Sequence, residues 1–240
     1  MRLLSVADLH YTLKQFDWLQ TVASDFDLIL IPGDLLDIVS PVDIETQILV
    51  VKKYLNRIPP ETTVLITSGN HDGDDRTASG ESVAGWLRET DRTGCLVDGA
   101  SFEMEDIRFT LCPWWDGEET RTQVDDLLAR EAEQVSDRWA WLYHAPPSGS
   151  PLAWDGRREF GDEVLVKWIE KYQPDLVFGG HIHQAPFARD GAWRDRIGST
   201  LLFNAGKQIG PVPAFLEIDT EANTVTWSSL AGVETETLFV

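Results

Sequence analysis

The chain has few cysteines and no long hydrophobic run. Cys95 and Cys112 lack the CxxC spacing of a zinc knuckle, and two thiols make no disulfide framework, so we expect both in the core. No apolar run approaches the roughly 20 residues that cross a membrane, so we expect no membrane contact. The apolar stretch after Met1 is too brief for a signal peptide and runs directly into Asp8, which favours a cytoplasmic location.

Basic residues are also scarce. The chain has 20 Lys and Arg against 40 Asp and Glu, a net charge of −20. Non-specific binding to nucleic acid depends on Lys and Arg that displace counterions from the phosphate backbone, so we expect no nucleic-acid partner. A small phosphorylated substrate remains compatible with this charge, because bound cations can invert the local potential.

The length and composition are typical of one globular domain, which we expect to cover residues 1–240. The first third alternates buried strands with amphipathic helices. We expect strands at 3–7, 27–31 and 63–67 and helices at 12–24, 41–58 and 81–90.

The middle of the chain favours short strands at 94–97, 101–104 and 107–112, which suggest a meander. Further on we expect helices at 118–134 and 162–172 and strands at 139–143, 176–178, 201–204, 214–219 and 224–230. A hairpin turn at Glu221-Ala222-Asn223 joins the last two strands. Without an internal repeat or linker, mixed sheets covered by helices are the simplest assembly.

Polar clusters rich in metal-ligating side chains follow the strand-like runs. These clusters are Asp8-Leu9-His10, Gly33-Asp34, Gly69-Asn70-His71-Asp72, His144 and Gly180-His181-Ile182-His183. Residues just beyond the carboxyl ends of strands in an α/β sheet converge on one crevice. Asp, Asn and His are oxygen and nitrogen ligands for divalent cations. The sequence therefore predicts one metal site assembled from five separate segments.

The spacing within these clusters indicates more than one ion. Asp8 and His10 are separated by one residue, so both can reach the same side of an extended segment. The ionised carboxylate of Asp34 has two oxygens and can bridge two ions. Two cations a few ångström apart are the usual arrangement for attack on phosphate esters.

In this order, the clusters resemble the signature of the calcineurin-like metallophosphoesterases, and the resemblance extends from Asp8 to about Gly206. It implies an α/β fold, a four-layer α/β/β/α sandwich of two mixed β-sheets flanked by helices. It also implies an enzyme, a metal-dependent phosphoric ester hydrolase that attacks a phosphodiester or a small organic phosphate by a metal-bridging hydroxide.

The resemblance further implies two divalent metal ions, with Mn favoured over Fe, Zn or Mg. One ion would be held by Asp8, His10, Asp34 and His183, and the other by Asp34, Asn70, His144 and His181. Asp34 would bridge the two ions.

By the same resemblance, His71 acts as a general acid or stabilises the transition state. Asp37 either orients His71 or takes a direct part in catalysis, and Asp72 is a rival orienting residue. Asp72, Asp74 and Asp75 also form an acidic run of the kind that usually lies in a solvated loop.

Two departures from the protein Ser/Thr phosphatases concern the substrate. Those enzymes read Gly-Asp-x-x-Asp-Arg and Gly-Asn-His-Glu, whereas this chain has Ile38 and Asp72 at the differing positions. The Arg that grips a phosphate is therefore missing, which favours phosphodiesters over phosphoproteins. A nuclease of the same chemistry is an alternative, which the acidic charge disfavours. A second alternative is a non-catalytic scaffold, because a retromer subunit shares this fold but has lost ligand residues. In this chain every ligand position is filled, which disfavours the scaffold.

Other residues near the motifs bear on substrate binding. Trp114-Trp115 either stacks on a base or aromatic ester group or packs under the rim of the site, and packing is the simpler reading. The cations nearest the motif loops are Arg76, Arg121, Arg157, Arg158 and Lys207, and one of them could hold a phosphate. The oligomeric state is not indicated.

Overall fold

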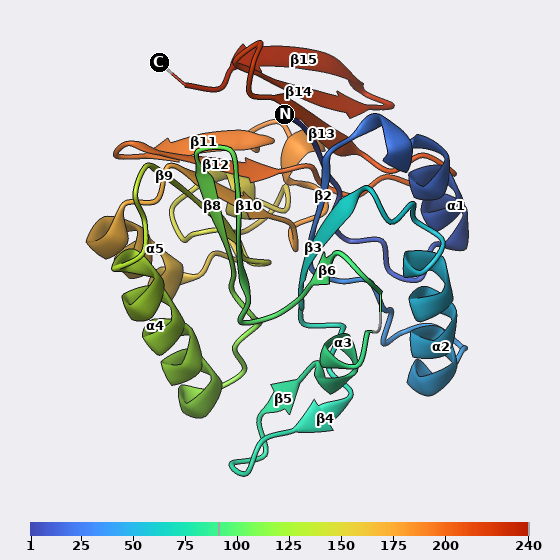
Figure 1. The fold of residues 1–240 in the computed structure, drawn as a ribbon. Helices are drawn as coiled ribbons and strands as arrows, with labels where there is room; N and C mark the ends of the chain where they lie inside the picture. The colour runs from blue at the N-terminus through green and yellow to red at the C-terminus, as the bar shows by residue number, and fades with distance from the viewer. Residues whose placement is uncertain (91, 240) are drawn as a thin grey trace.

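Two β-sheets pack face to face between two layers of helices (Figure 1). The computed structural model describes residues 1–90 and 92–239. The first sheet has the order β15-β14-β13-β1-β2-β3-β6, and the second has the order β11-β12-β10-β9-β8-β7. This arrangement confirms the four-layer sandwich of two mixed sheets.

The strands of the first sheet are β1 (Arg2–Ser5), β2 (Leu28–Pro32), β3 (Thr63–Thr67), β6 (Cys95–Leu96), β13 (Phe215–Asp219), β14 (Thr224–Ser229) and β15 (Gly232–Thr237). Those of the second are β7 (Ser101–Met104), β8 (Ile107–Leu111), β9 (Arg138–Leu142), β10 (Leu176–Gly179), β11 (Arg194–Ile197) and β12 (Thr200–Asn204). The helices α1 (Leu13–Val22), α2 (Ile44–Leu55) and the short α3 (Gly85–Arg88) cover the first sheet, and α4 (Glu118–Ala132) and α5 (Glu163–Tyr172) cover the second.

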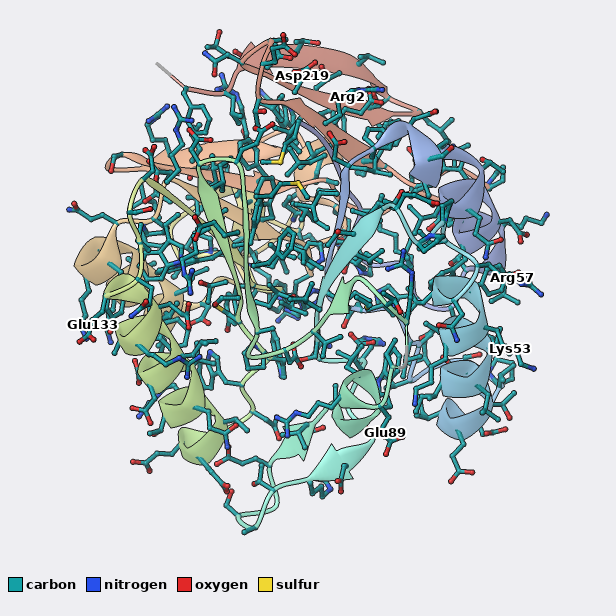
Figure 2. The ribbon with its side chains drawn as sticks, in the orientation of Figure 1. Arg2, Lys53, Arg57, Glu89, Glu133 and Asp219 are labelled. Atoms are coloured by element: carbon teal, nitrogen blue, oxygen red, sulfur yellow. The ribbon has the colours of Figure 1, made fainter. Side chains whose placement is uncertain are left out.

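The alternation of side chains along β2 shows how the layers are held together. Leu28 and Leu30 pack between the two sheets, whereas Ile29 and Ile31 pack beneath α1 and α2. All four are fully buried, as expected for a central parallel strand covered on both faces. A third apolar core lies between the second sheet and its helices. Charged side chains such as Lys53, Glu89 and Glu133 lie on the outside (Figure 2).

Most of the expected elements are present, and their ends are set by local caps. Helix α2 begins at Ile44 instead of residue 41, because the Asp43 side chain accepts a hydrogen bond from the Thr46 N–H at 2.8 Å. Asp162 caps α5 by accepting bonds from Val164 and Leu165. Among the described residues, none of the helices combines the length and apolar character that a bilayer span requires.

The expected helix at 81–90 is largely wrong. Ser82–Val83 forms strand β5, which pairs with β4 (Asp75–Arg76), and only the short α3 follows. The Glu81 carboxylate instead accepts bonds from the first backbone N–H groups of α4.

The expected three-strand meander is also wrong. Strand β6 pairs with β3 in the first sheet, and only β7 and β8 form an antiparallel hairpin in the second. Besides β4 and β5, strands β11 and β15 were not expected.

Candidate metal centre

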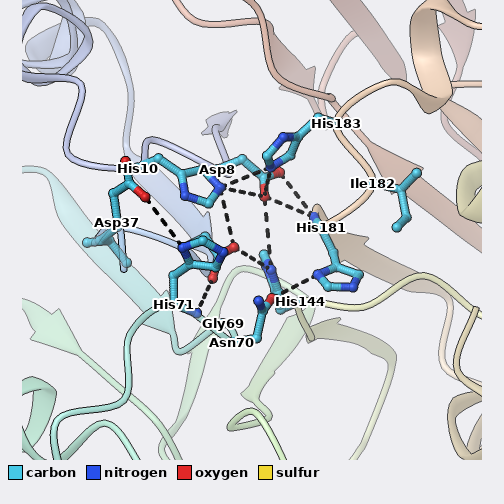
Figure 3. A network of polar contacts seen from close by, with 12 residues as sticks. Asp8, His10, Asp37, Gly69, Asn70, His71, His144, His181, Ile182 and His183 are labelled. Atoms are coloured by element: carbon cyan, nitrogen blue, oxygen red, sulfur yellow. Dashed lines mark hydrogen bonds and ion pairs between the residues drawn. The ribbon is translucent and has the colours of Figure 1, made fainter. Parts of the chain in front are cut away.

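The predicted ligands lie at the carboxyl ends of five strands. Strands β1, β2 and β3 are parallel neighbours in the first sheet, and β9 and β10 are parallel neighbours in the second. Because β2 packs against β9 and β10, the loops that follow these strands meet at one edge of the sandwich. Figure 3 shows the side chains of His10, His144 and His183 converging there, while Ile182 lies apart.

The ligands form two adjoining groups. The donor atoms of Asp8, His10, Asp34 and His183 lie within 4.8 Å of one another, and so do those of Asp34, His144 and His181. Asn70 joins the second group, because its Oδ1 lies 2.9 Å from His181 Nδ1. The structure therefore brings all seven predicted ligands together.

Asp34 belongs to both groups. Its Oδ2 lies 3.4 Å from His10 Nε2 and 3.2 Å from His144 Nε2. One carboxylate oxygen thus faces a ring nitrogen of each group.

The state of His144 tests whether these residues fit a metal ion. Its Nδ1 lies 2.8 Å from the carbonyl oxygen of Pro32, so this nitrogen carries a hydrogen and donates it, as is typical of metal-ligating histidines. The opposite nitrogen, Nε2, is buried without a hydrogen-bond partner and faces the Asp34 carboxylate. Although burial opposes protonation, the carboxylates of Asp34 and Asp8 raise the pKa of His144 to about 9. A cation at Nε2 is therefore favoured, and a metal ion would take the place of that proton.

The charge states of the other predicted ligands also fit a metal ion. Burial alone would raise the pKa of Asp8, but His10 and His183 hold it well below its usual range, so Asp8 is ionised. The histidines similarly outweigh burial at Asp34 and lower its pKa. Burial lowers the pKa of His181 to about 4, which keeps its ring neutral. Ionised carboxylates and neutral imidazole are the forms that bind divalent metals.

The backbone at the site is held in an uncommon conformation. Asp8, His10, Asp34 and His181 have φ angles of 56°, 40°, 55° and 71°. Non-glycine residues rarely adopt such angles, and the residues that do are concentrated at functional sites. The preceding glycines are required by close approach, because a Cβ at Gly33 would overlap the His144 ring and one at Gly180 would lie 2.6 Å from Asp8 Oδ2.

Asp72 holds this backbone in place. Its Oδ2 accepts bonds from the N–H groups of Asp34 and Gly69, and its Oδ1 accepts bonds from Leu35 and Leu36, all at 2.8–2.9 Å. The side chain is fully buried, so the expectation of a solvated loop is wrong for Asp72. The position of Asp72 directly after Gly69-Asn70-His71 could have indicated that it belongs to the site, but the acidic run favoured a solvated loop.

His71 lies beside the ligand groups. The backbone N–H of Ile38 donates to His71 Nδ1 at 3.3 Å, so the neutral ring carries its hydrogen on Nε2. Asp37 Oδ1 lies 3.7 Å from the same Nδ1, at ion-pair distance but without a hydrogen bond. Burial lowers the pKa of His71, which favours the neutral ring.

One of the candidate cations is tied to the site. The backbone N–H of Lys207 donates to the carbonyl of His183 at 3.1 Å. Burial lowers the pKa of Lys207 to about 8, with Asp8, Asp37 and Asp34 acting in the opposite direction. The other four lie elsewhere: Arg76 donates to the Gly80 carbonyl, Arg121 lies on α4, and the backbones of Arg157 and Arg158 bond to Asp155.

Comparison with solved structures supports the fold. TT1561 of Thermus thermophilus is 13% identical over 99% of this chain and 98% of that chain, with a TM-score of 0.60. A purple acid phosphatase of yellow lupin, Lupinus luteus, is 15% identical over 99% of this chain and 51% of that chain, with a TM-score of 0.55. Plasmodium GAP50, described as the anchor in the inner membrane complex, is 10% identical over 100% and 89%, with a TM-score of 0.56.

At these identities the likeness concerns the fold alone. No curated protein matches the sequence significantly. The family model of the calcineurin-like phosphoesterases matches residues 1–185, which include all seven predicted ligands. The chain therefore belongs to the calcineurin-like phosphoesterase family.

Proposed function

We propose that this chain is a binuclear metal-dependent hydrolase of phosphodiesters or small organic phosphates. The observation that carries the proposal is the partnerless Nε2 of His144, buried 3.2 Å from a carboxylate shared by two ligand groups. When bound, two divalent ions supply an activated water at neutral pH and neutralise charge on the phosphoryl oxygens. We propose Mn²⁺ as the ion, because mixed nitrogen and oxygen donors suit it.

Asp8, His10, Asp34 and His183 would hold one ion, and Asp34, Asn70, His144 and His181 the other. Asp34 is suited to bridging because its Oδ2 faces both groups while its Oδ1 accepts a bond from the His71 N–H at 2.9 Å. That bond fixes the orientation of the carboxylate. Pro32 similarly fixes the ring of His144 through Nδ1.

His71 would donate a hydrogen bond from Nε2 to the leaving-group oxygen and so stabilise the negative charge that develops there. The Ile38 N–H occupies Nδ1, so the neutral ring has its hydrogen on Nε2, where it can form this bond without proton transfer. Asp37 Oδ1, 3.7 Å from Nδ1, lies close enough to help hold the ring in this position. A donor placed at a developing oxyanion contributes about 10²–10³ in rate.

The site favours a diester over a monoester. Ile38 stands where a protein phosphatase carries Arg, and its side chain is 56% exposed and uncharged. Lys207 is the candidate cation held against the site, so little fixed positive charge is available beyond the ions. This lack of fixed positive charge weakens the binding of a diester, which carries one negative charge, less than the binding of a monoester dianion.

Hydrolysis of bis-p-nitrophenyl phosphate and p-nitrophenyl phosphate, measured side by side with Mn²⁺, tests this proposal. We expect two bound Mn²⁺ ions by elemental analysis and a higher kcat/KM for the diester. A clear monoester preference would contradict the diester assignment and leave the broader hydrolase.

The anchor description of GAP50 makes a scaffold the second candidate. Absence of both metal and hydrolysis would favour it. Salt-sensitive cleavage of single-stranded DNA would instead identify a nuclease.

A further inference from the structure

We infer that the cavity beside the metal centre binds the organic group of the substrate ester, and that this group is an aromatic ring without an anionic substituent. The inference rests on the proposed phosphoester hydrolysis and specifies its substrate.

The cavity has a volume of about 560 Å³, within the range of small-molecule sites. His181, a predicted metal ligand, forms part of its wall, so the cavity opens directly from the metal centre. The ring of Trp114, which also lines it, lies 5.6 Å from the His181 ring and 5.8 Å from the His144 ring. A phosphate at the ions would therefore place one of its ester groups in this cavity.

Hydrogen bonds to Asp162 hold two of the aromatic side chains of the cavity in place. Trp115 Nε1 donates to Asp162 Oδ2 at 3.1 Å, and the Tyr143 hydroxyl donates to the same oxygen at 2.6 Å. Phe160 forms a further wall. Fixed aromatic surfaces suit a flat ring, because side chains that are already held in place lose little conformational freedom when a ring stacks on them.

Charge excludes an anionic group. Asp116, Asp162 and Glu163 line the cavity, and none of its described lining residues is Lys or Arg. Asp162 caps α5 and accepts the two bonds from the aromatic residues, and Asp116 accepts a bond from the Ser82 N–H. A second negative charge on the ester would meet these carboxylates at close range.

Binding of phosphinates to the Mn²⁺-loaded protein, measured by calorimetry, tests this, because both of their substituents are joined to phosphorus by P–C bonds that phosphoester hydrolysis does not break. The four probes are methylphosphinates whose second substituent is a methyl, benzyl, 4-carboxybenzyl or 4-(trimethylammonio)benzyl group, and they share one anionic head. Stacking contributes about 1–3 kcal/mol, so we expect the benzyl probe to bind roughly tenfold more tightly than the methyl probe. We expect the carboxybenzyl probe to bind several-fold more weakly than the benzyl and trimethylammoniobenzyl probes.

Variants locate the effect. Trp115→Ala should reduce the benzyl-to-methyl ratio to about two, whereas Trp154→Ala, which removes a tryptophan from a separate hollow beside Ser150, should leave it unchanged. If Trp115→Ala does not fold, Glu163→Gln, on the first turn of α5, gives a second test. It should raise the affinity for the carboxybenzyl probe relative to the benzyl probe about threefold.

Equal binding of the methyl and benzyl probes by a metal-loaded, hydrolytically active protein would overturn this inference and leave the proposed function intact. Binding of the carboxybenzyl probe as tight as that of the benzyl probe would overturn the exclusion of an anionic group. A protein that neither binds Mn²⁺ nor hydrolyses bis-p-nitrophenyl phosphate would contradict the proposed function itself.

Discussion

Replacing Asp72 with Asn should destabilise the protein severely, although the two side chains have nearly the same shape. The carboxylate accepts four backbone N–H bonds, two on each oxygen. An Asn side chain keeps one oxygen, and its NH₂ group then faces two N–H donors. A buried donor left without a partner costs about 1–3 kcal/mol, so two of them cost about 2–6 kcal/mol. Domains of this kind are stable by about 5–15 kcal/mol in total.

Urea unfolding in the presence of EDTA measures this loss without any contribution from metal. The experiment belongs at pH 8, because burial and the Asp34 carboxylate raise the pKa of Asp72 to about 7. Asp98→Asn is the matched control: Asp98 accepts a bond of 2.8 Å from the Ser68 N–H, which an amide oxygen can accept equally well, so this variant should be no less stable than the wild type. Equal unfolding midpoints for the two variants would refute the reasoning. Because Asp72 fixes the backbone of Asp34, Asp72→Asn should also bind Mn²⁺ more weakly in titrations of the folded protein.

Three further outcomes are expected. Asp34→Asn should lose bound Mn²⁺ in elemental analysis and reduce turnover by more than roughly a hundredfold, because a neutral amide cannot bridge two cations; two retained ions with near-normal activity would exclude bridging. His71→Ala should keep both ions and lose about 10²–10³ in kcat with alkoxide leaving groups but less with nitrophenolate, which carries less charge on its oxygen, and equal losses would indicate a positional role. Burial raises the pKa of Asp98 from 3.8 to about 6, so its contribution to stability is present below pH 3.8 and is lost as the pH rises through 6. Asp98→Asn should therefore gain up to about 3 kcal/mol over the wild type between pH 4 and pH 7 in urea unfolding, and parallel pH profiles would contradict this.

The sequence predicted the central strands and the ligands because each depends on local pattern. Strand β10 is a short buried run that ends at Gly180-His181, and both its burial and its polar end can be read from adjacent residues. The missed strands β11 and β15 lie at sheet edges and carry mostly polar side chains, so they lack the apolar pattern of a buried strand.

Other features depend on contacts between distant residues. The sheet to which β6 belongs is decided by its pairing with β3, about 30 positions earlier in the chain. The burial of Asp72 likewise follows from donors at residues 34–36, which no pattern around residue 72 reveals. Local sequence therefore identifies the residues that converge at the candidate site but not the buried carboxylate that positions one of them.

The shared position of the two ligand groups at the edge of both sheets has a mechanical consequence. Asp8, His10 and Asp34 follow strands of the first sheet, whereas His144, His181 and His183 follow strands of the second. Each ion bound by these residues would therefore link the first sheet to the second. It would also close a loop of more than a hundred residues in the chain, as a covalent cross-link does. Metal loading should then raise the unfolding temperature by mass action. It should oppose separation of the two sheets more strongly than it opposes fraying of either sheet.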